Sequence, residues 1–105
     1  MSKFTLADLE KRVHERAKAG AKESYTRALL DKGVSHCAKK LGEEAIETAI
    51  AAVQESKGRL VAEAADLLYH LLVVLKARGV TLAQVEAVLQ KRTAQSGHAE
   101  KASRK

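Results

Sequence analysis

Residues 40–78 read KLGEEAIETAIAAVQESKGRLVAEAADLLYHLLVVLKAR. Apolar residues recur in this stretch every three or four positions, which is the spacing of a helix with an apolar face. Lys57 and Gly58 interrupt the pattern, so we predict one helix over about 35–56 and a second over about 59–78. Because their connection is short, the two helices should pack antiparallel. This hairpin decides the fold.

Cap residues predict three further helices around the hairpin. A side-chain oxygen at the start of a helix accepts a hydrogen bond from a backbone N–H that has no partner within the helix, and glycine commonly follows the end. The sequence has no proline and is rich in Ala, Leu, Glu, Lys and Arg, which favour helix throughout. The predicted starts of the three helices are Thr5 with Asp8, Ser24, and Thr81 with Gln84, and the first two end at Gly20 and Gly33. In the hairpin itself, Ser35 is the predicted start of the first helix and Gly79 the predicted end of the second.

The sequence of 105 residues therefore predicts an all-α protein of one domain. We expect an antiparallel helical bundle of about five helices over residues 1–94, followed by a polar, basic C-terminal tail over residues 95–105. The fourth predicted helix, over about 59–78, is apolar on nearly all sides, and so short a chain cannot easily surround it. A second copy should complete the bundle by dimerisation, most simply as a two-fold homodimer.

The charge balance favours an anionic partner. Lys and Arg exceed Asp and Glu by 19 to 13, a formal charge of +6. Such a charge suits a nucleotide, a nucleic acid or an acidic membrane, and it also occurs in proteins that are basic for solubility alone. The balance therefore leaves these alternatives open until a site is found.

The sequence also indicates a compartment. Cys37 is the only cysteine, so no intrachain disulfide is expected, and we interpret it as a small buried apolar residue. The N-terminus lacks the apolar stretch of a signal peptide, and the most apolar run, residues 67–75, is too short to cross a bilayer. We expect a cytoplasmic protein.

Acidic residues recur on both hairpin helices. Glu44 and Glu47 lie three residues apart on the polar half of the first, which on its own is an ordinary solvated face. Glu63, Asp66 and His70 share one narrow stripe of the second, which is otherwise apolar. Two carboxylates on such a stripe repel each other and lose hydration. A cation should offset that cost.

Antiparallel packing can bring Glu44, Glu47, Glu63 and Asp66 face to face. Sites built from several carboxylates select hard divalent cations, so we predict a Mg²⁺ centre held by these four residues, with Mn²⁺ as a substitute. A di-iron bundle needs Glu-x-x-His on two helices, which this sequence lacks. His70 is either a hydrogen-bond partner of Asp66 or a satisfied core histidine, and we prefer the second interpretation.

An Mg²⁺ ion held by carboxylates keeps coordination positions that the protein does not fill, and phosphate oxygens can bind there. It can polarise a phosphoryl group and lower the pKa of an attacking water. Lys40, four residues before Glu44, either forms an i, i+4 salt bridge or reaches a substrate phosphate. The glycine-rich Walker loop is absent, which argues against a P-loop kinase or ATPase.

Several stretches together carry a resemblance over nearly the whole chain. They include KKLGEEAIETAIAA (39–52), AEAADLLYHLLVVLKARGVTLAQVEAVLQKR (62–92) and SGHAEKASRK (96–105). The chain resembles the phosphoribosyl-ATP pyrophosphohydrolase family of histidine biosynthesis, within the MazG-like all-α nucleotide pyrophosphohydrolase superfamily. The superfamily's pattern is E-x-x-E, a spacer and E-x-x-D, and the four acidic residues fill it without departure.

The resemblance implies a homodimeric enzyme that uses Mg²⁺ to hydrolyse phosphoribosyl-ATP to phosphoribosyl-AMP and pyrophosphate. A carboxylate outside the inner metal shell is expected to take the proton of the attacking water, and Glu44 or Glu47 is our candidate. No nucleic-acid or membrane partner is expected. The candidate substrate-binding residues, which are polar or basic, are Lys40, Ser24, Tyr25, Thr26, Lys101, Ser103 and Arg104.

Three other functions compete with this interpretation. A general house-cleaning nucleoside triphosphate pyrophosphohydrolase has the same acidic pattern, although the SYT stretch and the tail favour the histidine pathway. A small basic nucleic-acid-binding protein usually gathers its basic and aromatic residues on one face, whereas here they are few or scattered. A structural adaptor leaves the two acidic residues of the apolar helix unexplained.

Overall fold

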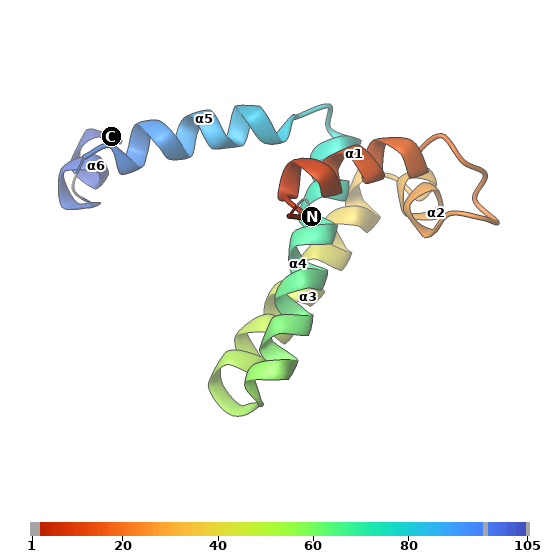
Figure 1. The fold of residues 1–105 in the computed structure, drawn as a ribbon, viewed down its shortest axis with the longest axis horizontal. Coiled ribbons are helices and arrows are strands. Elements are labelled where there is room, and N and C mark those ends of the chain that lie inside the picture. Colours follow the sequence, from red (N-terminus) through yellow and green to blue (C-terminus); the bar gives the residue numbers. More distant parts are fainter. Residues whose placement is uncertain (1–2, 96, 105) are drawn as a thin grey trace.

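The computed structural model describes residues 3–95 and 97–104, and every regular element within them is a helix. The helices are α1 (Leu6–Arg16), α2 (Tyr25–Asp31), α3 (Val34–Gln54), α4 (Lys57–Ala77), α5 (Leu82–Thr93) and α6 (Gly97–Ser103), as Figure 1 shows. The predicted all-α class is confirmed, and the sixth helix lies in the tail, where the sequence predicted none. No helix in these residues is long and apolar enough to cross a membrane.

The antiparallel hairpin predicted from the sequence is formed by α3 and α4, which pack side by side along their length. Only Glu55 and Ser56 separate them. Ser56 caps α4, because its Oγ accepts a hydrogen bond from the Arg59 N–H at 3.2 Å. The predicted break at Lys57 and Gly58 is therefore wrong. A good N-cap outweighs the low helix propensity of a single glycine in the first turn.

Two other helix limits differ from the prediction. α3 begins at Val34, without the predicted Ser35 cap, because Gly33 precedes it with a φ of 93°. Only glycine adopts such a φ without steric cost, so one residue both ends α2 and begins α3. α1 ends at Arg16, before the predicted stop at Gly20, and turns fill the interval.

The remaining predicted caps are confirmed. The Thr5 N–H donates to Asp8 Oδ2 at 2.9 Å, and the Asp8 N–H donates to Thr5 Oγ1 at 3.1 Å. Thr81 and Gln84 form the same reciprocal box at the start of α5, and the Ser24 hydroxyl caps α2. These local contacts set where the helices begin.

The apolar core lies where α1 and α2 pack across one end of the hairpin. The prediction that Cys37 is buried is confirmed: its Sγ donates to the Leu29 carbonyl oxygen at 3.3 Å. Burial raises the pKa of the Cys37 thiol, which keeps it protonated and structural. The buried members of this core are Val13, Leu29, Cys37, Leu72, Val73 and Leu82.

The other half of the hairpin has almost no apolar core. Ala51 is buried there, whereas large apolar side chains of both helices face solvent. Ile46 is 64% exposed, Val53 is 85% exposed and Val61 is 69% exposed. Exposed apolar groups at this density usually mark an interaction surface. The sequence predicted that a second copy would cover the fourth helix, α4, which contributes Val61 to this exposed surface.

α5 projects away from the body, and α6 packs against its far end; we call the two helices the arm (Figure 1). At the base of the arm Leu82 is buried, and its N–H donates to Glu10 Oε2 at 2.8 Å. The radius of gyration is 15.8 Å, whereas a compact chain of this length has about 13 Å. The predicted fifth helix exists, but it lies outside the bundle.

Candidate metal centre

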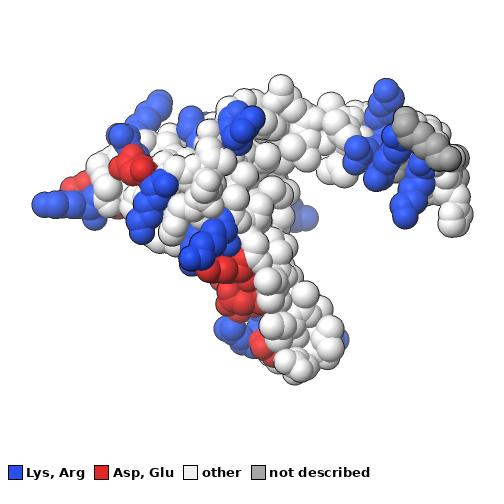
Figure 2. All heavy atoms as spheres, turned by 180° about the vertical axis from the view of Figure 1, so that it is seen from behind, with Lys and Arg blue, Asp and Glu red and all other residues white. Residues whose placement is uncertain are grey.

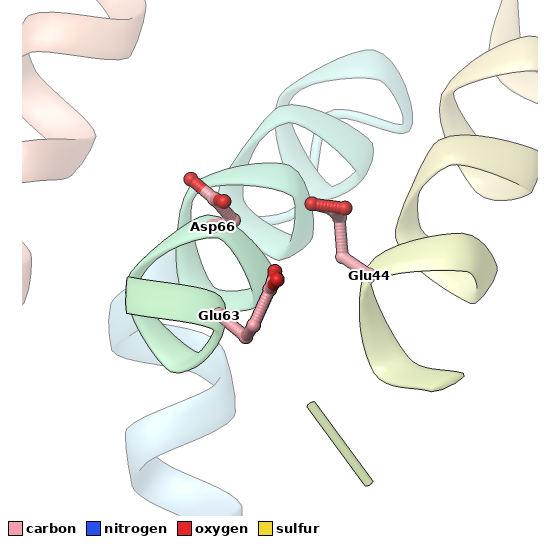
Figure 3. Close-up of side chains that lie close together, drawn as sticks. All are labelled: Glu44, Glu63 and Asp66. Atoms are coloured by element: carbon pink, nitrogen blue, oxygen red, sulfur yellow. The ribbon is translucent and has the colours of Figure 1, made fainter. Parts of the chain in front are cut away.

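Three carboxylates from the two hairpin helices point into one small space, as Figure 3 shows. Glu44 comes from α3, whereas Glu63 and Asp66 come from α4. One oxygen of each lies within 4.8 Å of the others. The i, i+3 spacing places Glu63 and Asp66 on one face of α4, and antiparallel pairing brings Glu44 opposite them. The structure thus brings together three of the four predicted ligands, which we call the carboxylate group.

The members of the carboxylate group differ in exposure. Glu63 is 6% exposed, Glu44 is half-buried and Asp66 is exposed. The expectation that Asp66 lies on a buried stripe is therefore wrong, because α4 turns that edge toward solvent. The group opens on one side, which leaves room for a polyanionic ligand to approach.

Glu47, the fourth predicted ligand, lies beside Glu44 but outside the carboxylate group. The pKa of Glu44 is raised, first by burial, then by the hydrogen bond with Glu47, and further by the charges of Glu47, Asp66 and Glu63. Each of these causes disfavours the ionised form of Glu44. A bound cation favours that form, so the arrangement suits a divalent metal.

Arg59 already offsets part of this negative charge. Its Nη2 donates to Glu63 Oε2 at 2.6 Å, and its Nε lies 3.5 Å from Glu55 Oε1. Arg59 thus supplies part of the positive charge that we predicted to offset the carboxylates of the second hairpin helix. Because the Arg59 side chain is largely exposed, this pairing is weak and can yield to a metal ion.

Thr48 joins the two helices at the carboxylate group. Its Oγ1 lies 2.7 Å from the carbonyl oxygen of Glu44 and 3.1 Å from that of Glu63, so one hydroxyl hydrogen serves the backbone of both residues. No role for Thr48 was predicted from the sequence. Its signal was a hydroxyl one turn after Glu44, in a stretch otherwise rich in Ala and Ile.

Lys40 pairs with a different residue from the one considered. Its Nζ lies 3.1 Å from Glu43 Oε1, at i, i+3 spacing. The i, i+4 bridge to Glu44 is therefore wrong, because the side chain of Glu43 offers the nearer oxygen. That bond to Glu43 raises the pKa of Lys40, so the ammonium stays charged beside the carboxylate group.

His70 matches neither of its two interpretations. The residue is buried, but its Nδ1 has no hydrogen-bond partner among the described residues, so it is neither satisfied nor bonded to Asp66. Its ring lies edge-on to Tyr69 at 5.0 Å and to Tyr25 at 6.3 Å between centroids. Burial lowers the pKa of His70, and the charge of Lys40 lowers it further. The imidazole is therefore held neutral at the edge of the carboxylate group.

The profile of the phosphoribosyl-ATP pyrophosphohydrolase family matches residues 6–93. The chain belongs to the phosphoribosyl-ATP pyrophosphohydrolase family. Phosphoribosyl-ATP pyrophosphatase 1 of Bradyrhizobium diazoefficiens is 62% identical over 105 residues, which cover 100% of this chain and 99% of that protein. Phosphoribosyl-ATP pyrophosphatase of Azorhizobium caulinodans is 63% identical over 102 residues, 97% of this chain and 94% of that protein. The resemblance found in the sequence is confirmed.

In this member of the phosphoribosyl-ATP pyrophosphohydrolase family, the predicted substrate-binding residues at the start of α2 line a cavity of about 500 Å³. The Ser24 hydroxyl donates to the Arg16 carbonyl oxygen at 2.9 Å, and Thr26 Oγ1 lies 2.6 Å from the Tyr69 hydroxyl. Tyr25 is exposed and stacks on Tyr69, with ring centroids 6.4 Å apart. The residues that line the cavity are Arg16, Ala19, Glu23, Ser24, Tyr25, Thr26 and Tyr69.

The three candidates in the tail lie elsewhere. Lys101 and Ser103 are on α6 and Arg104 follows it, at the far end of the arm (Figure 1). Figure 2 shows acidic side chains gathered along the hairpin and a separate cluster of basic side chains at the end of the arm. Within one chain, the structure does not bring the tail candidates to the carboxylate group.

Proposed function

We propose that this protein is a cytoplasmic enzyme of histidine biosynthesis that hydrolyses phosphoribosyl-ATP to phosphoribosyl-AMP and pyrophosphate with Mg²⁺. The observation that carries the proposal is the carboxylate group, formed by two packed helices in a member of this family. Its ligands are all oxygen and partly open to solvent, which suits a hard cation that must also bind phosphate.

In this reaction the oxygen of a water forms a bond to phosphorus as the anhydride bond between the α- and β-phosphates breaks, and pyrophosphate leaves. Mg²⁺, when bound, supplies charge stabilisation for the phosphoryl oxygens and lowers the pKa of a coordinated water. Glu44, Glu63 and Asp66 would hold the ion. Glu47 lies beside Glu44 but outside the group, so it is the better placed of our two candidates to accept the proton of the water.

The cavity at the start of α2 accommodates the phosphoribosyl-adenine part of the substrate. Tyr25 offers an exposed aromatic face, and Arg16 contributes a positive charge at the rim. Ser24 supports this cavity structurally, because its hydroxyl caps α2 and donates to the Arg16 carbonyl oxygen. Lys40, charged and next to the carboxylate group, is placed to meet a phosphate.

The active form is a homodimer. The chain exposes 7749 Å², whereas a compact monomer of its mass exposes about 5,800 Å². The excess of about 2,000 Å² per chain is the area that a large, stable dimer interface buries. Exposed apolar side chains on both hairpin helices are the natural contacts of that interface: Ile46, Ile50, Val53, Val61 and Leu68.

The test compares pyrophosphate release from phosphoribosyl-ATP with release from a panel of ordinary nucleoside triphosphates. Phosphoribosyl-ATP should be turned over far faster, only with Mg²⁺ or Mn²⁺, and not in chelator. Equal rates across the panel would indicate a general house-cleaning enzyme. Full turnover in chelator would remove the metal from the proposal.

A further inference from the structure

The cavity at the start of α2 is built by hydrogen bonds between α1 and α2. The Ser24 hydroxyl joins the start of α2 to the Arg16 carbonyl oxygen, at the end of α1. Arg27 strengthens this junction, because its Nη1 donates to the Ala17 carbonyl oxygen at 3.0 Å while its Nε donates to Asp31 Oδ1 at 2.8 Å. These contacts set the shape of the cavity before a ligand binds.

Two side chains of opposite charge line this cavity without an ion pair. Arg16 and Glu23 both belong to its lining. Among the described residues neither is ion-paired, whereas Arg27 is engaged within α2. Burial raises the pKa of the Tyr69 hydroxyl, while the bond with Thr26 and the charge of Arg16 act in the opposite direction. The Arg16 guanidinium therefore lies close enough to act on the cavity wall, and both charges can meet a ligand.

The turn before α2 places the Glu23 carboxylate. The N–H groups of Glu23 and Ser24 both donate to the Gly20 carbonyl oxygen, at 3.1 and 3.0 Å. This turn folds the Glu23 side chain back over Gly20, where a Cβ atom would lie 2.7 Å from Glu23 Oε2. Such a separation is too short for a Cβ atom and an oxygen, so the carboxylate can occupy this position only because residue 20 is glycine.

The cavity adjoins the carboxylate group along α4. Tyr69, in the cavity wall, follows Asp66 by three residues, and side chains at that spacing on a helix are neighbours, with Cβ atoms about 5–6 Å apart. Tyr25 stacks on Tyr69 and exposes an aromatic face, on which a nucleotide base can stack. A nucleotide whose triphosphate lies at the carboxylate group can therefore place its base on Tyr25 and extend into the cavity.

Phosphoribosyl-ATP carries a ribose 5-phosphate on its adenine base, a group that ordinary nucleoside triphosphates lack. A guanidinium binds a phosphate through parallel hydrogen bonds, and a carboxylate accepts hydrogen bonds from ribose hydroxyls. We propose that Arg16 and Glu23 form the subsite for this ribose 5-phosphate, in which the Arg16 guanidinium binds the phosphate and the Glu23 carboxylate binds the ribose hydroxyls. This assignment rests on the proposed function and deepens it, because it names the residues that select phosphoribosyl-ATP over ATP.

Titration calorimetry in chelator tests the subsite apart from the metal. The two ligands are phosphoribosyl-AMP and AMP, which differ only by the ribose 5-phosphate, so the ratio of their Kd values measures what that group contributes. The parent should bind phosphoribosyl-AMP more tightly. Arg16→Gln should reduce that preference by about tenfold, the usual effect of losing a hydrogen bond to a charged group, and Arg16→Lys should keep part of it. No preference in the parent, or an unchanged ratio in Arg16→Gln, would overturn the assignment.

Two substitutions test the role of Glu23. Glu23→Ala should reduce the preference for phosphoribosyl-AMP by about 3- to 10-fold. Gly20→Ala should have a similar effect, because the added Cβ displaces the carboxylate, which can swing into solvent without disturbing the backbone. Since both changes remove one contact, the double variant should bind phosphoribosyl-AMP no more weakly than Glu23→Ala alone. Additive losses, or full preference in Glu23→Ala, would remove Glu23 from the subsite.

Arg12→Gln is the matched control. Arg12 lies one turn before Arg16 on α1, with its guanidinium 4.8 Å from the centroid of the Phe4 ring, and it does not line this cavity. Its loss removes the same charge and should leave the ratio unchanged. An equal fall in Arg12→Gln and Arg16→Gln would assign the effect to net charge and overturn the subsite. The Ser24 bond uses the backbone of Arg16, which each variant retains, and thermal unfolding in chelator checks that the variants fold.

Turnover separates the subsite from the proposed function. A parent protein that does not release pyrophosphate from phosphoribosyl-ATP would overturn the proposed function. A parent that does so, together with an Arg16→Gln variant that keeps the full preference for phosphoribosyl-AMP, would overturn the subsite alone. If both hold, Arg16→Gln should also lower the ratio of kcat/KM for phosphoribosyl-ATP to that for ATP by about tenfold.

Discussion

Replacing Glu44 by Gln should stabilise the metal-free protein and remove most of its response to Mg²⁺. The Glu44 carboxylate lies within 4.8 Å of oxygens of Glu63 and Asp66. Two unit charges at this separation repel by about 1 kcal/mol in water, and by about 3.5 kcal/mol at an effective dielectric constant of about 20. The group opens to solvent, and Arg59 neutralises part of the charge of Glu63. We therefore expect the free energy of unfolding in the absence of metal to rise by about 1 kcal/mol, the low end of this range.

Thermal unfolding measures this effect at one fixed protein concentration, in chelator and in excess Mg²⁺. A gain of about 1 kcal/mol corresponds to a rise in Tm of about 4–8 °C for a domain of this size. Mg²⁺ at about a hundred times its Kd should stabilise the parent by about 2.7 kcal/mol. Glu44→Gln should lose most of that protection, because the neutral amide is a poor ligand.

The pH dependence gives a second check on the same variant. A raised pKa means that Glu44 binds its proton more tightly when the protein is folded. The ionised Glu44 carboxylate therefore lowers the stability of the folded protein at pH values above that pKa. As the pH falls through the pKa, the parent protonates Glu44, and the advantage of Gln should disappear.

Glu43→Gln is the matched control. It removes the same charge one residue away, where Glu43 pairs with Lys40 outside the carboxylate group. This variant should keep the Mg²⁺ response of the parent. If Glu44→Gln instead lowers Tm in chelator, or if Mg²⁺ protects it as well as the control, Glu44 has a structural role and the electrostatic reasoning fails.

Three further substitutions test other parts of the structure. Thr48→Val should lower the free energy of unfolding in urea by about 1 kcal/mol, because it removes the shared hydrogen bond. It should also weaken the stabilisation by Mg²⁺. Unchanged stabilisation by Mg²⁺ would mean that the register of the hairpin does not position the ligands. Burial lowers the pKa of His70, so stability in chelator should fall as the pH drops through about 6.5, where the unfolded chain takes up the proton first. His70→Gln should flatten that slope, and an unaltered slope would assign it to other groups. Ile50→Glu should convert the proposed dimer to monomers in light scattering, and an intact dimer would place the interface elsewhere.

The all-helical class and the starts of several helices could be predicted because their causes are local. The capping boxes at Thr5 and Thr81 need only residues three positions apart, and both form as the sequence predicts. The pairing of Glu44 with Glu63 and Asp66 needs one additional step, a short connection that makes the helices antiparallel. Spacing and connection length were therefore sufficient to predict most of the carboxylate group.

Features that depend on contacts between helices could not be predicted from the sequence pattern. Glu63 is buried while Asp66 is exposed, although both lie on the same stripe, because the packing of side chains sets the rotation of α4 about its axis. Glu10 accepts a backbone hydrogen bond from Leu82, 72 positions away. Thr48 bonds the backbone of two helices at once. Each of these contacts exists only after the chain has folded.

The position of the carboxylate group links metal binding to assembly. The group lies on the half of the hairpin that is outside the apolar core. Among the described side chains of that half, those of Ala51 and Glu63 are buried. A ligand set holds a metal tightly only when surrounding contacts fix its geometry. Within one chain, Thr48 and the Arg59–Glu63 pair supply few such contacts. A second copy that covers the exposed apolar face would stiffen both helices where they carry the ligands, so dimer formation and metal affinity should strengthen each other.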